Sequence, residues 1–234
     1  MAYTALTAQS VAARAAMIIQ DLTNVRWPIT ELLNWLNDSR RELAVNRPDM
    51  YSTTIEDHSL SAGAKHDLPA GALRLLDIPR NYNGKAVTVT QRGFLDQQNP
   101  GWAASSFQSD TIKHFMVDER DKTHFWVYPP SNGSAKVCLI YQAAPEDFAL
   151  ASGNTEIAGA MNDFETLYAG AMVDYICYRA FSKDSEYAGN AQRALAHYQQ
   201  FLNALGIGHK SDLTYSPNLT NVGGVPSKQL ATGG

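Results

Sequence analysis

Three side chains in the middle of the chain could form a metal site. His114 and His124 lie on the two arms of an expected β-hairpin, and Asp118 lies in the turn between them. Imidazole and carboxylate groups are ordinary ligands of Zn²⁺, so such a site would support metal-dependent hydrolysis. Histidines on strand faces beside a solvated turn explain the same pattern without a metal. This second interpretation is the favoured one.

The turn of this hairpin is strongly charged. Its carboxylates could hold Mg²⁺, and they come from Asp118, Glu119 and Asp121. Arg120 and Lys122 alternate with them, which favours a turn that neutralises its own charge. We therefore expect a structural turn here.

Aromatic side chains follow on the second arm of the hairpin. Phe125, Trp126 and Tyr128 could stack on the bases of single-stranded nucleic acid. No basic residue adjoins these rings in the sequence to hold a phosphate backbone. A place in the core or at a subunit interface is therefore favoured.

The two cysteines, Cys138 and Cys177, suggest no disulfide framework, so we expect a reducing compartment. Cys177 lies on an expected core-facing helix, where thiols are usually inert packing residues. The chain has no Walker loop, dinucleotide glycine fingerprint, nucleophile elbow or paired-cysteine zinc pattern. We expect no enzyme activity, and no catalytic, cofactor-binding or metal-binding residues.

The composition is that of an ordinary globular protein, with 44% hydrophobic and 18% charged residues in 234. A net charge of −4 gives no general attraction to nucleic acid or to an anionic membrane. It is compatible with a surface along which DNA passes without sticking. We find no membrane-spanning run and no signal-peptide pattern, and we expect a protein made and used in a cytoplasm.

Two helices are expected before the hairpin region. The first runs from an N-cap at Thr7 to residue 23, and its buried face includes Ile18 and Leu22. Thr30 is expected to cap the second, which ends at Pro48. Its buried stripe consists of Leu32, Leu33, Trp35, Leu36, Leu43 and Ala44. Arg40 and Arg41 are expected on its solvent side, or at an interface.

The middle of the chain predicts short strands. Residues 86–90 alternate with a period of two, as a half-buried strand does. Residues 112–117 and 123–128 are the arms of the hairpin, and Pro129 with Pro130 is expected to end the second arm. Residues 136–141 form the last strand.

Two antiparallel helices are expected after residue 160. The apolar stripe of the first is Phe164, Leu167, Tyr168, Ala171, Tyr175 and Tyr178. The stripe of the second is Tyr187, Ala191, Leu195, Tyr198, Leu202 and Leu205. Gly206 is expected to end this helix. The segment beyond it is rich in Gly, Ser, Asn, Thr and Pro, which bury too little surface to fold alone.

These elements predict an α+β fold. Helix pairs at residues 1–50 and 160–206 pack as a helical core around an inserted antiparallel β domain at residues 51–145. Residues 146–159 are a connector, and residues 207–234 are an extended C-terminal tail.

Three segments resemble the head-to-tail adaptor (connector) proteins of tailed bacteriophages. The first is the helical opening LLNWLNDSRREL at residues 32–43, with RPD at 47–49. The second is the hairpin, VDERD at 117–121 with FWVYPP at 125–130. The third is DYICYRAFSKD at 174–184, followed by Tyr187. The resemblance spans about residues 8–205.

The resemblance implies a virion protein at the neck, assembled in the host cytoplasm, that forms a ring of commonly twelve copies under the portal. Such a ring extends the DNA channel, and genomic DNA passes through its lumen without sequence-specific binding. Tail or nozzle proteins would dock on the β domain. Residues 208–234 would dock on the portal. No membrane and no cofactor are implied.

Alternatives remain open. The chain could be another neck or tail-completion protein of the virion. It could be a metal-dependent hydrolase that uses His114, His124 and Asp118, or a monomeric binding module.

Overall fold

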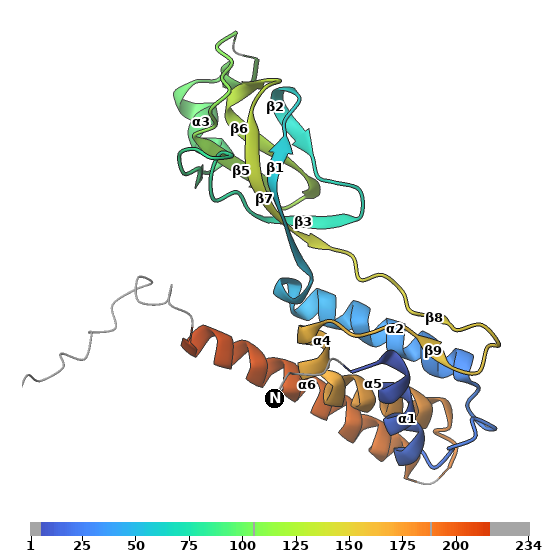
Figure 1. Ribbon diagram of the computed structural model, residues 1–234. Coiled ribbons are helices and arrows are strands. Elements are labelled where there is room, and N and C mark those ends of the chain that lie inside the picture. The colour runs from blue at the N-terminus through green and yellow to red at the C-terminus, as the bar shows by residue number, and fades with distance from the viewer. Residues whose placement is uncertain (1–5, 105, 188, 216–234) are drawn as a thin grey trace, which may run out of the picture. The chain divides into compact units, whose positions relative to one another are not determined.

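A computed structural model describes residues 6–104, 106–187 and 189–215. The chain divides into two compact units. The helical unit draws on both ends of the chain, up to Arg47 and from Asp147 onward, and the β unit is Pro48–Glu146. Figure 1 labels their elements. Helices in one unit and mainly antiparallel sheets in the other confirm the expected α+β class.

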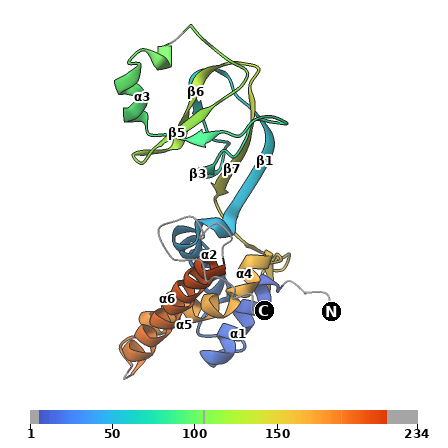
Figure 2. The same ribbon diagram turned by 90° about the vertical axis from the view of Figure 1, so that its left-hand side faces the viewer.

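The helical unit is built around one nearly all-apolar helix. Its elements are α1 (Ala8–Ile18), α2 (Ile29–Asn46), β8 (Ala149–Leu150), β9 (Ile157–Ala158), α4 (Asp163–Leu167), α5 (Ala169–Lys183) and α6 (Asn190–Tyr215). α5 packs against α1, α2 and α6, and Figure 2 shows it between α6 and α1. A helix that is apolar on most sides needs such cover. The segment expected to be a connector contains the β8–β9 pair.

α1 begins where the sequence predicts and ends earlier. The Thr7 hydroxyl oxygen accepts the N–H of Ser10, which confirms Thr7 as the N-cap. The predicted end at residue 23 is wrong, because the helix stops at Ile18 and Gln20 has a φ of 58°. Ile18 and Leu22 were expected in the buried face, and they are 46% and 69% exposed.

A single carboxylate shapes the turn from α1 to α2. The buried Asp21 side chain accepts the backbone N–H groups of three consecutive residues, Val25, Arg26 and Trp27. Because these donors are satisfied, the chain can leave the helical conformation before the break at Pro28. Pro28 is the N-cap of α2, and the expected cap Thr30 lies inside the first turn. The predicted buried stripe of α2 is confirmed.

Arg40 is a correction to the sequence prediction, because it is buried. Its Nε lies 2.6 Å from Oε1 of Glu165, and the two side chains are 9% and 1% exposed. Glu165 also closes the N-terminus of α4, where it forms a capping box with Asn162. The positive charge of Arg40 is therefore neutralised by Glu165, which comes from the C-terminal part of the chain.

The same part of α2 holds the segment that returns from the β unit. The Arg40 guanidinium lies 4.0 Å from the ring centroid of Phe148. One turn earlier, Asn37 donates to the Phe148 carbonyl (3.1 Å) and accepts its N–H (2.9 Å). Gly159 leaves room for this ring, since an added Cβ would lie 2.6 Å from it. The returning segment is thus fixed on α2.

The C-terminal helices present different faces from those predicted. The first one divides at Tyr168 into α4 and α5, and Phe164 and Leu167 are exposed. In α6 the face toward α5 contains Ala194, Phe201 and Leu205. Four members of the predicted stripe are exposed instead: Tyr187, Ala191, Leu195 and Leu202. The aromatic residues of α5 set this rotation, with Tyr175 packed on Phe201 and Tyr178 on Tyr198.

α6 does not end at Gly206 but continues to Tyr215. Gly206 lies on the open side of the helix, where an added Cβ meets nothing within 4 Å. Gly208 lies against Tyr168, whose hydroxyl accepts a hydrogen bond from Arg47. The absence of a side chain at Gly208 lets α6 pass this pair. Of the expected tail, residues 216–234 lie outside the described residues.

The β unit contains two sheets and three short helical pieces. One sheet has the order β1-β7-β3, and the other has the order β2-β6-β5-β4. The elements are η1 (Pro48–Tyr51), β1 (Ser52–Ser59), β2 (Ala62–Asp67), β3 (Ala72–Asp77), β4 (Thr88–Val89), α3 (Arg92–Gln98), η2 (Trp102–Ala104), β5 (His114–Asp118), β6 (Asp121–Asn132) and β7 (Lys136–Ala143). All pairs within the two sheets are antiparallel except β4 with β5.

The core of the β unit lies between the sheets. Alternate residues of β7 and β6 face it, among them Val137, Leu139, Phe125 and Val127, all fully buried. The opposite face of β6 packs with Trp102 of η2 and Leu95 of α3 in a second cluster. The β5–β6 hairpin predicted from the sequence is confirmed.

Two predictions about strand ends in this unit are wrong. β6 runs through Pro129 and Pro130 to Asn132. These prolines lie where the pairing of β2 with β6 is irregular, so the sheet needs no backbone N–H from them. The Pro130 carbonyl accepts a hydrogen bond from the N–H of Ser109. The predicted strand at 86–90 is reduced to β4, because the chain passes only briefly beside β5.

Replacement of Gly208 by alanine should lower the melting temperature of the helical unit, because the new methyl group would meet the Tyr168 hydroxyl. Gly206→Ala is the matched control, since it makes the same change in open space and gains about 1 kcal/mol of helix propensity. Thermal denaturation followed by far-ultraviolet circular dichroism compares the two. A Gly208→Ala variant as stable as Gly206→Ala would contradict the close packing.

Arg40→Met should cost roughly 3–5 kcal/mol of unfolding free energy, because it leaves the Glu165 carboxylate buried without its partner. Arg40→Met/Glu165→Gln should recover part of this loss, since glutamine removes the charge and keeps the cap. Arg41→Met is the control, because Arg41 pairs with Asp38 at the surface and should cost less than about 1 kcal/mol. Urea denaturation measures all three. Equal costs for the two arginines would contradict the assignment.

Candidate functional site

The structure does not bring the three predicted metal ligands together. In the β5–β6 register His114 lies opposite Tyr128, on whose ring it stacks, far along the hairpin from the turn. The Asp118 carboxylate accepts the N–H of Arg120 (2.9 Å) and so closes the turn. Within the described ranges, no cluster of three or more His, Cys, Asp or Glu residues is placed to hold a metal ion.

His124 instead joins β6 to β2. Its Nδ1 lies 2.6 Å from Oδ1 of Asp121, and its Nε2 lies 2.8 Å from Oδ1 of Asp67. Lys65 of β2 is 3.2 Å from the other oxygen of Asp121. The hydrogen bond from His124, assisted by Lys65, lowers the pKa of Asp121. The hairpin turn is thus neutralised across the sheet as well as by its own sequence.

The aromatic residues of β6 point to alternate faces of the sheet. Phe125 is fully buried in the core. Trp126 faces outward and lies beside Trp102, with ring centroids 6.1 Å apart. Arg92 and Lys65 place their charges 4.7 and 5.7 Å from the Trp126 ring. The expectation that basic neighbours are lacking is wrong, because these cations come from α3 and β2. Arg92 and Lys65 thus already contact the Trp126 ring within the β unit itself.

Two contacts place a hydroxyl beside an imidazole, as nucleophilic catalysis requires. Thr88 lies 2.7 Å from Nδ1 of His114, and Ser61 lies 3.4 Å from Nδ1 of His66. The other nitrogen of His66 faces the Gly63 carbonyl, and its ring packs near Phe125. Both pairs tie strands and turns of the β unit together.

Cys177 is fully buried in the helical unit, and burial raises the pKa of its thiol to about 12. Burial also raises the pKa of Cys138. Both thiols are free, and both are mainly protonated at neutral pH.

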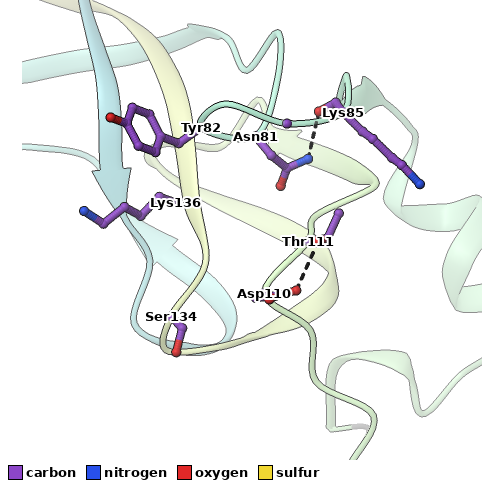
Figure 3. Close-up of a pocket in the computed structure, with 8 residues that line it drawn as sticks. Asn81, Tyr82, Lys85, Asp110, Thr111, Ser134 and Lys136 are labelled. Atoms are coloured by element: carbon purple, nitrogen blue, oxygen red, sulfur yellow. Dashed lines mark hydrogen bonds between the residues drawn. The ribbon is translucent and has the colours of Figure 1, made fainter.

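A polar cleft of about 390 Å³ lies in the β unit (Figure 3). Asn81 fixes its wall, since its side chain donates to the carbonyls of Lys85 and Ile112 and accepts the N–H of Ile112. Tyr82 and Lys136 lie side by side at one end, with the ammonium 5.8 Å from the ring centroid. Lys85 extends away from them in Figure 3.

The side chains of this cleft can bind polar groups. Its charged and hydroxyl groups come from Tyr82, Lys85, Asp110, Thr111, Ser134 and Lys136. Its lining residues include no imidazole or thiol, and the Thr111 hydroxyl donates to the Asp110 carboxylate at 3.1 Å. The exposed Tyr82 ring is suited to contact with another protein, because tyrosine is enriched at interfaces.

The helical unit exposes several large apolar side chains. Those exposed by at least 42% are Met17, Ile18, Leu22, Val25, Val45, Phe164, Leu167, Tyr187, Leu195, Leu202 and Ile207. Isolated cases are normal at a protein surface, whereas contiguous ones mark interaction sites. These exposed side chains are therefore candidates for contact with other proteins.

The family model described as SU10 adaptor protein matches residues 4–221 of the chain. The chain belongs to this family, which consists of phage head-to-tail adaptor proteins. The resemblance carried by the three sequence segments is thereby confirmed. Comparison with curated proteins gives no match.

Family membership identifies the chain as a bacteriophage protein with an adaptor role among head and tail components. Each helix in the described part of the chain is too short or too polar to cross a membrane.

The β unit should lose stability as the pH falls below 6.5. Burial lowers the pKa of His66, and that of His58, below the usual 6.5. The unfolded chain therefore takes up these protons at a higher pH than the folded chain does, and acid favours unfolding. His66→Gln should reduce this pH dependence. Urea unfolding midpoints measured between about pH 8 and pH 5 give this pH dependence. If the midpoint of the His66→Gln variant changed with pH as steeply as that of the unchanged protein, the role of His66 would be contradicted.

Proposed function

We propose that this protein is a structural adaptor that forms a ring below the portal of a tailed phage. The observation that carries the proposal is the family match over residues 4–221. The ring extends the DNA channel, and the protein is then a component of the virion neck, assembled in the host cytoplasm. Twelve copies are the expected number, as the resemblance to adaptors implies.

The exposed apolar side chains of the helical unit support a role in assembly. A ring needs a heterologous interface, in which one surface of each copy meets a different surface of the next. The unit carries exposed apolar residues on α1 and on α6, which lie on different sides of α5. An unpaired monomer would leave both surfaces in water.

The β unit is the proposed docking surface for tail or nozzle proteins. Its polar cleft offers Tyr82, Lys85 and Lys136, and Phe94 and Phe107 are 55% and 67% exposed. Aromatic side chains are enriched at protein interfaces. The dispersed hydroxyl, imidazole and carboxylate groups support a structural role rather than catalysis.

DNA passage through the lumen requires weak contact with the phosphate backbone. The net charge of −4 supports passage without sequence-specific binding, because an excess of positive charge would retain DNA. The channel-lining residues depend on the ring geometry.

Native mass measurement of the protein, alone and mixed with its portal, tests the proposed ring. We expect a closed ring, alone or in complex with the portal, because the exposed apolar surfaces are buried only in an assembly. A protein that stays monomeric in both samples would contradict the proposal.

The C-terminal segment is proposed to bind the portal, because its Gly-, Ser-, Asn-, Thr- and Pro-rich sequence buries little surface by itself. Truncation after Tyr215 keeps α6 whole and should abolish portal binding in a pull-down assay. Substitution of residues 216–234 by a glycine–serine linker of equal length is the control for length, and it should also fail to bind. Full binding by the truncated protein would exclude this role.

A further inference from the structure

We infer that adjacent copies in the proposed ring meet through α6 of one copy and a groove beside α1 of the next. The inference rests on the proposed ring and adds the two surfaces that join its copies. The α6 surface is defined as the exposed face containing Leu195, Gln199, Leu202 and Asn203. The α1 groove is defined as the cavity between α1, the following loop and the start of α2.

The α6 surface is unusual because it is exposed and uncharged. From Ala194 to Gly208 the helix contains no Asp, Glu, Lys or Arg. Its one ionisable group there, His197, faces α5, where it lies 2.8 Å from Asp174. Exposed helix faces normally carry charges, and a face depleted of them is typical of an interface core.

Leu195 and Leu202 form an apolar ridge on this surface. They are 57% and 42% exposed. The two residues are seven positions apart, so they lie on one side of the helix, about 10 Å from each other. Neutral amide and small side chains surround them, so the ridge can enter an apolar groove without burying a charge.

The α1 groove has matching properties. It is a cavity of about 80 Å³, and none of its lining residues is Asp, Glu, Lys or Arg. Its walls include the small residues Ala12, Ala13 and Ala16. Met17 and Leu22 also line it, and they are 64% and 69% exposed. A groove with small residues and flexible apolar side chains admits the ridge of another helix.

The residues that line the cavity follow α1 from Gln9 to Met17, which is about 12 Å of helix. The cavity itself is about 80 Å³, so it admits one apolar side chain of the ridge. Two matched features of one chain are what a heterologous contact between copies requires.

The positions of the two surfaces exclude contact within one helical unit as described. α5 lies between α6 and α1, as Figure 2 shows. The ridge of a chain cannot reach its own groove across α5, so a second copy must supply it. Because the surfaces differ, each copy contacts one neighbour with its ridge and another with its groove, and the contact can continue around a ring.

Cross-linking between two single-cysteine variants tests this contact. Leu195→Cys or Leu202→Cys is mixed with Ala13→Cys or Met17→Cys, with portal present, and treated with a short bismaleimide. The native Cys138 and Cys177 are buried and should not react. We expect a cross-linked pair in at least one mixture and none from any variant alone. The absence of cross-links in every mixture, or cross-linking of a ridge variant with itself, would overturn the inference.

Charge substitution provides the second measurement. Leu195→Asp should weaken assembly tenfold or more, because it places a carboxylate in a neutral interface. Val45→Asp is the matched control, since Val45 is 70% exposed on α2 and lies outside both surfaces. Circular dichroism checks that both variants fold. Equal weakening by the two substitutions would overturn the assignment to α6.

The outcomes separate the contact from the proposed function. If native mass measurement finds a ring and the mixtures give no cross-link, the ring stands and the α6–α1 contact is wrong. If the protein stays monomeric with portal, both the proposed ring and this contact are wrong. If the portal or residues 216–234 cover the α6 surface instead, the mixtures give no cross-link between copies, and the contact is likewise wrong.

Discussion

The buried ion pair between Arg40 and Glu165 is the constraint on which the helical unit depends. The two residues come from parts of the chain that the whole β unit separates. An arrangement that separated them would leave a charge buried without a partner, which costs far more than the pair contributes. The pair therefore specifies how α2 docks on α4, and Phe148 and the capping box of α4 are fixed with it. The helical core can keep one packing despite the inserted β unit, because any other packing of α2 and α4 would leave a charge buried without a partner.

Local signals were enough to predict much of the fold. The cap at Thr7, the stripe of α2 and the β5–β6 hairpin follow from side-chain chemistry within a few residues, and the structure confirms them. The errors arose where a residue far away in the sequence determines whether a side chain is buried or where a strand ends. Arg40 was expected on the solvent side or at an interface, because its partner Glu165 is 125 positions away in sequence. Pro129 and Pro130 were expected to end β6, because the irregular pairing with β2 is a property of the sheet. No local pattern contains this information.

The candidate site illustrates the same limit. His114 and His124 are both on the hairpin. The strand register places His114 opposite Tyr128, whereas His124 contacts Asp67 of β2. Conversely, Lys65 and Arg92 surround Trp126 although they are far from it in sequence. The chemistry-bearing residues of the β unit thus join strands, and their grouping reflects sheet construction. What distinguishes this chain is the apolar surface left over after both cores are complete.

One wrong prediction about α6 is informative for this reason. The stripe that includes Tyr187, Leu195 and Leu202 was expected to face the core because its spacing is helical and its residues are large and apolar. The structure exposes these three residues and buries Ala194 and Phe201, together with Leu205 of the predicted stripe. A helix with apolar residues on two faces is stable only if both are covered. α5 covers one, and the neutral sequence from Ala194 to Gly208 indicates that the other is also removed from water. The periodicity therefore signals an apolar face, and in the proposed ring the partner of that face is a second copy of the chain.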